Sequence, residues 1–197
     1  MSSSLIEQLT GQLSGPALQA LTQQLGSDQA TTSAAISAAL PMLIGALDKN
    51  TNDPQGAQSL QNALTRDHDG SILNDLVGFL GSSDTGMGGA ILGHIFGQKQ
   101  GAAEQGISKM SGMNPALVSM LLKNLAPIVM GQLGKQQREQ GLDADSLSSM
   151  LGTERASAQQ TGGSQSTAVD LITSLMDQDG DGSMLDDIGG MLGKFLR

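Results

Sequence analysis

Apolar residues recur at intervals of three and four positions through nearly the whole chain, and the apolar–polar alternation of β-strands is absent. The first apolar stripe consists of Leu5, Ile6, Leu9 and Leu13. Pro16 suits the first position of a second helix. Asp28 can cap a third and longer helix that runs to about Lys49. The spacing therefore predicts an all-α protein of short helices joined at Gly-rich segments.

Two long predicted helices share one irregularity, a proline placed four residues before a glycine. The segment LPMLIGAL (40–47) aligns with APIVMGQL (126–133), which matches Pro41 to Pro127 and Gly45 to Gly131. Inside a helix, proline costs roughly 3 kcal/mol and glycine roughly 1 kcal/mol relative to alanine. A shared and costly pair favours internal duplication. We expect each proline to kink its helix and each glycine to let a neighbouring helix approach closely.

The core of this bundle must be aliphatic, because the chain has three Phe, no Trp and no Tyr. Eleven methionines can fill irregular gaps in such a core. We expect the two central helices to bury Ile36, Leu40, Leu43, Leu47, Leu122, Leu125, Val129 and Leu133.

A second repeat aligns DGSILNDLVGFLG (69–81) with DGSMLDDIGGMLG (181–193). Both copies resemble the start of a helix, with Ser71 and Ser183 as predicted N-caps. Between the repeats, GTERASAQQTGGSQST (152–167) lacks large apolar residues and is rich in Gly, Ser, Thr and Gln. The predicted organisation is a duplicated helical domain (1–151), a flexible linker (152–167) and a tail made of a helix, an acidic loop and a helix (168–197).

Several of these segments together resemble a known family. The paired segments ALPMLIGAL and LAPIVMGQL, the stretch ILGHIFG (91–97) and the tail DQDGDGSMLDDIGGMLGKFL are similar to the YidB-like bacterial family, domain of unknown function 937. The resemblance extends over most of the chain. It implies an all-helical bacterial protein, and it implies no activity and no functional residues, because the family is uncharacterised.

Composition argues against several classes of protein. The net charge is -9 and the ten basic residues are scattered, so no basic stripe could follow a nucleic-acid backbone. The absence of cysteine excludes disulfides, thiolate catalysis and Cys-based zinc sites. The N-terminal sequence has no basic segment followed by a long apolar run, so we expect a cytoplasmic protein, with export by another route left open.

A membrane role is also disfavoured by the sequence. The most apolar long stretch, 115–133, carries Lys123 and Asn124 near its centre, where a charge is costly in lipid. The polar faces are acidic or neutral, which does not suit an anionic membrane surface. We interpret 115–133 as a buried helix.

Few residues could support catalysis. The two histidines are His68 and His94, and no nucleophile, base and orienting acid stand at a recognisable spacing. The Gly-rich segment 77–97 lacks the Gly-Lys-Ser/Thr ending of a phosphate loop. We expect His68 to neutralise the acidic turn in which it lies. The sequence thus favours a protein that is not an enzyme, and an enzyme using His94 is the alternative.

Three small residues, Gly89, Gly93 and Gly97, fall on one face of a predicted helix. Such a face suits close packing within the molecule or against a second copy. The sequence therefore favours a structural or interaction protein that binds a protein partner or itself, and a self-assembling or lipid-surface helical protein is the other alternative.

The acidic loop DQDGDGSMLDD (177–187) is the one candidate metal site. Asp177, Asp179 and Asp181 occupy positions one, three and five of an EF-hand-like loop, and Gly182 follows at position six. Ser183 would offer its backbone carbonyl, and Asp186 or Asp187 would close the site, because position twelve is Ile188 instead of glutamate. The sequence predicts weak calcium binding, and the competing interpretation is a turn in which Ser183 caps a helix.

Overall fold

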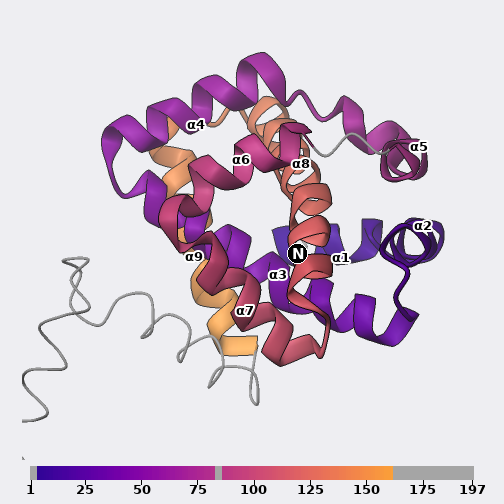
Figure 1. Cartoon of the computed structure of the whole chain (residues 1–197). Helices are drawn as coiled ribbons and strands as arrows, with labels where there is room; N and C mark the ends of the chain where they lie inside the picture. Colours follow the sequence, from indigo (N-terminus) through magenta and orange to yellow (C-terminus); the bar gives the residue numbers. More distant parts are fainter. Residues whose placement is uncertain (1–3, 83–85, 162–197) are drawn as a thin grey trace, which may run out of the picture.

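A computed structural model describes residues 4–82 and 86–161, and within these residues every regular element is a helix (Figure 1). The all-α prediction is confirmed. The elements are α1 (Leu5–Gln12), α2 (Pro16–Leu25), α3 (Gln29–Thr51), α4 (Pro54–Asp67), the 3-10 helix η1 (Ser71–Asp75), α5 (Leu76–Gly81), α6 (Gly86–Phe96), the 3-10 helix η2 (Gly97–Lys99), α7 (Gln100–Ser111), α8 (Pro115–Gln140) and α9 (Ala144–Thr161).

Local sequence signals set several of the helix boundaries. Pro16 is the first residue of α2, and the Asp28 carboxylate accepts a hydrogen bond from Thr31 N (2.8 Å) at the start of α3. At α1, Ser4 and Glu7 form a reciprocal capping box. Helices α2 and α3 therefore begin where the sequence predicts.

The two long helices α3 and α8 form the centre of the molecule (Figure 1). All eight aliphatic residues that were expected in the core are buried there: Ile36, Leu40, Leu43, Leu47, Leu122, Leu125, Val129 and Leu133. Both helices continue through their proline, Pro41 in α3 and Pro127 in α8. The kink at each proline and the internal duplication stay predictions.

The central helices are also the two described helices that are long and apolar enough to cross a bilayer. In the most apolar 18-residue stretch of each helix, 61% of the stretch in α3 and 72% of that in α8 is buried inside the protein. Their apolar surface is therefore used mostly in packing against the other helices.

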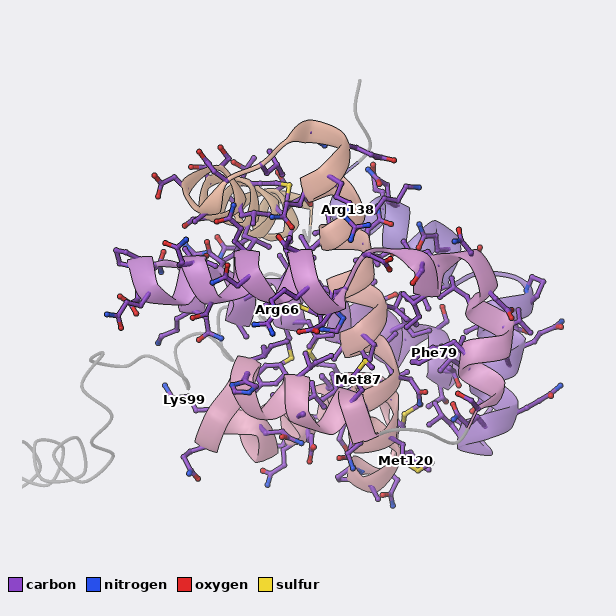
Figure 2. All side chains as sticks on the ribbon, turned by 90° about the horizontal axis from the view of Figure 1, so that it is seen from above. Arg66, Phe79, Met87, Lys99, Met120 and Arg138 are labelled. Carbon is purple, nitrogen blue, oxygen red and sulfur yellow. The ribbon has the colours of Figure 1, made fainter. Side chains whose placement is uncertain are left out.

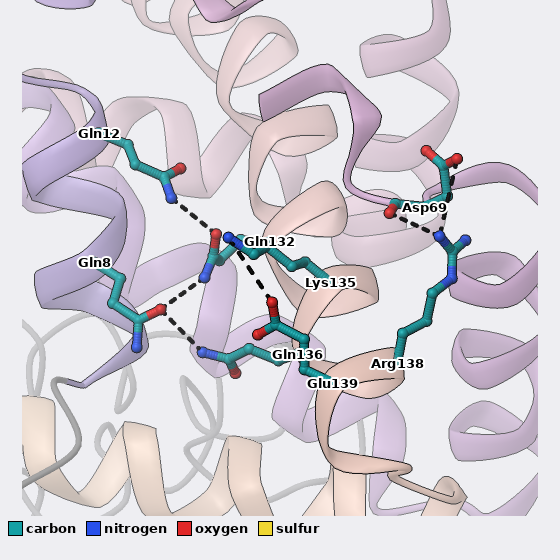
Figure 3. A network of polar contacts seen from close by, with 8 residues as sticks. All are labelled: Gln8, Gln12, Asp69, Gln132, Lys135, Gln136, Arg138 and Glu139. Atoms are coloured by element: carbon teal, nitrogen blue, oxygen red, sulfur yellow. Dashed lines mark hydrogen bonds and ion pairs between the residues drawn. The ribbon is translucent and has the colours of Figure 1, made fainter. Parts of the chain in front are cut away.

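The remaining helices surround this pair. Helix α9 packs along α3, α6 packs along α8, and α7 contacts both central helices. Helix α1 is joined to α8 by side-chain amides: Gln8 Oε1 accepts hydrogen bonds from Gln132 Nε2 (2.7 Å) and Gln136 Nε2 (3.3 Å), and Gln12 Nε2 donates to Gln132 Oε1 (2.9 Å) (Figure 3). These bonds give partners to the buried side-chain amides of Gln132 and Gln136, which would otherwise be costly to bury.

The structure corrects the predicted linker. Residues 152–161 belong to α9, and 162–167 lie outside the described residues. The helix continues past Gly152 because polar side chains anchor it: Arg155 Nε lies 3.0 Å from Asp48 Oδ2, and Glu154 Oε1 accepts a hydrogen bond from Leu5 N (2.9 Å). A segment without large apolar residues is thus held in place by charged ones. The tail 168–197 lies outside the described residues.

The predicted N-cap at Ser71 is also wrong. Ser71 is the first residue of η1, and Asp69 Oδ1 accepts the hydrogen bond from Ser71 N (2.9 Å). Gly70 between them has φ 85°, in the left-handed region that glycine adopts without strain. The local turn is therefore stabilised by the aspartate instead of the serine.

Candidate functional site

The predicted calcium ligands Asp177, Asp179, Asp181, Ser183, Asp186 and Asp187 lie outside the described residues. Over 4–82 and 86–161, no group of three or more His, Asp or Glu side chains is placed to hold a metal ion. The site that the structure does present is a cavity.

The cavity lies between α4 and α6 and has a volume of about 790 Å³. Helix α4 packs on α3, α8 and α9, and α6 packs on α3, α7 and α8, but α4 and α6 hardly contact one another. Figure 2 looks onto these two helices, with Met87 near the start of α6 and Lys99 beyond its end. Because both helices pack on α3 and α8 but hardly contact one another, a space remains between them.

The inner surface of the cavity is apolar. It is formed by side chains from α3, α4, α6 and α8, namely Leu47, Leu60, Ile91, Ile95, Phe96 and Met130. All of these are at least nine-tenths buried in the protein. They would offer a ligand contact area of the kind that dominates small-molecule sites.

The outer part of the cavity carries polar and charged groups. Lys49 from the last turn of α3, Asp53 just before α4, His94 from the last turn of α6 and Lys99 from η2 all line it. Lys49, Asp53 and His94 are exposed, and Lys99 is half-buried. The cavity thus combines an apolar interior with a mixed and mainly basic rim.

Asn50 fixes one side of this rim. Its side-chain Nδ2 donates hydrogen bonds to the backbone carbonyls of Ile95 (3.0 Å) and His94 (3.2 Å). These bonds give donors to carbonyls in the last turn of α6, where the helix itself supplies no N–H group for them. They also hold the end of α6 at a set position relative to the end of α3.

The structure places His94 on this cavity, and it does not bring His68 near it. The His68 region lies at the end of α4, where Asp69 faces Arg138 (Nη1–Oδ2 3.9 Å) and Arg138 Nη1 donates to the Asp69 carbonyl (3.0 Å) (Figure 3). Burial lowers the pKa of His68, and the nearby Asp67 opposes this shift. Hydrogen bonds from Ser71 lower the pKa of Asp69. Arg138, and not His68, therefore balances the charge of this turn near neutral pH.

Gly89, Gly93 and Gly97 do not make the close packing within the molecule that was one of the two roles expected of this face. A Cβ atom added at Gly93 or Gly97 would meet nothing within 4 Å, and one at Gly89 would just reach the Lys123 side chain. The close approach occurs at Gly88, where a Cβ would overlap the backbone carbonyl of Lys123 in α8. Self-association through the Gly89–Gly93–Gly97 face stays a prediction.

The cavity was not predicted from the sequence, because its lining comes from five elements that no local pattern connects. A partial signal existed. Lys49 and Lys99 each closely follow an apolar helical segment that the sequence marks as core. Nothing in the spacing indicated that the two segments end beside each other.

Comparisons with known proteins identify a family for this chain. No curated protein and no solved structure matches the chain. A family model described as "Bacterial protein of unknown function (DUF937)" matches residues 7–136, which is more than half of the chain and includes α2 to α7. The acidic loop lies outside the matched range. On this match, the chain belongs to the bacterial family of unknown function DUF937.

Proposed function

We propose that this protein is a non-enzymatic binding protein that takes up its ligand in the cavity between α4 and α6. The supporting observation is the cavity itself, with a volume of about 790 Å³ and an apolar interior under a polar rim. Small-molecule sites commonly have volumes of about 300–1,000 Å³ and the same division between apolar walls and a few polar groups.

The test is binding of a neutral, environment-sensitive dye such as Nile red to the full chain. The protein has no Trp and no Tyr, so its own fluorescence hardly interferes. Ala63 in α4 lines the cavity, and Ala63→Phe should fill part of it. Ala102 in α7 is exposed and does not line it, so Ala102→Phe is the matched control.

We expect saturable dye binding to the wild type and to Ala102→Phe, with a loss of at least about tenfold in affinity for Ala63→Phe. Circular dichroism must show that both variants remain helical. Non-saturable binding, or equal binding by the two variants, would contradict the proposal.

The rival hypothesis is an enzyme that uses His94, since His94 lines the same cavity. Under the binding hypothesis, His94→Ala should keep most of the affinity for neutral Nile red, which has no anionic head group to place at the rim. A turnover activity that disappears in a folded His94→Ala variant would favour the enzyme instead.

Calcium binding by the tail is a second and separate proposal, favoured by the five carboxylates between Asp177 and Asp187. The missing glutamate at position twelve argues for a weak site, with a Kd of about 0.1–1 mM. Titration calorimetry on the wild type and on Asp179→Asn combined with Asp181→Asn tests it. Absence of heat and of thermal stabilisation at several millimolar calcium would leave the loop as a capped turn.

A further inference from the structure

The charges around the cavity differ from those of the protein as a whole. The chain has nineteen acidic and ten basic residues, with a net charge of -9. The cavity is lined by two lysines, one histidine and one aspartate. Two of the ten basic residues of this acidic protein, Lys49 and Lys99, therefore lie at the mouth of the apolar cavity.

The positions of these two lysines at helix C-terminal ends are one physical reason for positive charge there. Lys49 lies in the last turn of α3 and Lys99 follows the end of α6, where the helix dipole favours a positive charge. The same dipole would repel an anionic ligand from the end of α6. Asn50 offsets this by donating hydrogen bonds to the carbonyls of His94 and Ile95.

Both lysines also have interactions of their own within the protein. An anionic ligand would therefore respond to the sign of the charges at the rim, and not to an unpaired ammonium group. The polarity of the cavity adds the second constraint: its buried interior is lined by Leu47, Leu60, Ile91 and Met130, so only an apolar group suits that end.

We propose that the cavity binds a single-chain anionic amphiphile, a fatty-acid-like carboxylate or an alkyl phosphate. Its head group would lie at Lys49, Lys99 and His94, and its alkyl chain would lie along the apolar interior. This inference rests on the binding function proposed above and adds the chemical class of the ligand.

The experiment is titration calorimetry on the full chain with four ten-carbon probes below their micelle concentrations: decanoate, decyl phosphate, 1-decanol and decyltrimethylammonium. We expect at least one of the two anions to bind about tenfold more tightly than the alcohol, which corresponds to about 1.4 kcal/mol. The cation should bind most weakly. The comparison of decanoate with decyl phosphate identifies the preferred head group.

Paired substitutions separate head-group recognition from chain burial. Lys49→Gln with Lys99→Gln should remove the preference for anions and leave decanol binding unchanged. Lys109→Gln with Lys123→Gln makes the same change in net charge at residues that do not line the cavity, and it should keep the preference. Equal loss in both double variants would indicate a long-range charge effect and would contradict a site at the rim.

Three further outcomes would overturn the inference. If all four probes bind equally, the cavity binds apolar molecules regardless of the charge of the head group. The proposed binding function is then supported, but the preference for anions is not. If neither the probes nor Nile red bind, that function fails as well. Sedimentation with phosphatidylglycerol vesicles, without binding of monomeric anions, would indicate a membrane surface as the partner and would overturn the free amphiphile.

Discussion

The two central helices carry matching Pro–Gly segments, yet their glycines meet different surroundings. In α3, a Cβ atom at Gly45 would meet only the Arg155 side chain, at an ordinary 4.0 Å. In α8, a Cβ at Gly131 would lie 2.5 Å from Ile72 Cγ2, and Gly70 lies beside it. The aligned glycines thus differ, because packing leaves no room for a side chain at Gly131 and leaves room for one at Gly45.

The difference continues one turn further along each helix. Three residues after Gly45 stands Asp48, whose side chain is 5% exposed and pairs with Arg155 of α9. Three residues after Gly131 stands Gly134, where a Cβ would overlap the backbone carbonyl of His68. One central helix is therefore joined to its neighbour through a charge, and the other through close backbone contact.

The largest effect should follow Gly134→Ala. The added methyl group would overlap the His68 carbonyl oxygen, a backbone atom that cannot turn aside, so α8 must move away from the end of α4. We expect a loss of about 3 kcal/mol in the free energy of unfolding. Urea denaturation followed by circular dichroism at 222 nm measures it, and an unchanged midpoint would show that this contact is not tight.

The charged contact of α3 should have the next largest effect. Arg155→Gln leaves the buried carboxylate of Asp48 without its ion-pair partner, and we expect a loss of about 2 kcal/mol. Adding Asp48→Asn should recover part of this loss, because the amide carries no charge to compensate. Arg138→Gln is the control: its pair with Asp69 is about half exposed on both sides, so stability should change little.

The paired glycines themselves give the third test. Gly131→Ala should cost about 1 kcal/mol, because overlap with Ile72 exceeds the gain in helix propensity. Gly45→Ala has room for its methyl group and should stabilise the protein by up to about 1 kcal/mol. Ile72→Ala in the Gly131→Ala background should remove the overlap and show a favourable coupling in a double-mutant cycle. Changes of the same sign at both glycines would contradict the comparison.

The smallest effect should come from the pH dependence of His68. Burial lowers its pKa below the unfolded value of about 6.5, so the folded state binds fewer protons than the unfolded state in this range. The contribution of neutral His68 is complete above about pH 6.5 and is lost as the pH falls through the lower folded pKa. The Tm should therefore fall slightly more between pH 7.5 and 5.5 in the wild type than in His68→Gln. The lowered pKa values of Asp28 and Asp143, which accept hydrogen bonds at helix starts, act only at more acidic pH.

Much of the fold followed from local rules. The cap at Asp28, the start of α2 at Pro16 and the aliphatic stripe of α3 and α8 depend on residues within or next to one helix, and all appear where the sequence predicts them. The extension of α9 to Thr161 could not be predicted in this way. It depends on Asp48 and Leu5, which stand far away in the sequence.

The two candidate sites differ in the same way. The acidic loop is a local pattern, and the sequence alone suggested it, although its residues lie outside the described part of the chain. The cavity depends on how α4 and α6 pack on α3 and α8, which is a property of tertiary structure. The sequence marks His94 as a catalytic candidate, but only the structure shows that His94 lines the same cavity as Lys49 and Lys99.

The contact between α3 and α9 bears on how the chain matures during synthesis. Residues of α3 leave the ribosome well before Arg155 and the buried Leu147 and Leu151 of α9 have been made. Until then, the Asp48 carboxylate can remain hydrated and the surface of α3 that α9 later covers stays open to water or to a chaperone. Helix α9 therefore covers an apolar surface of α3 that is made much earlier. In a nascent chain stalled before α9, that surface would stay exposed.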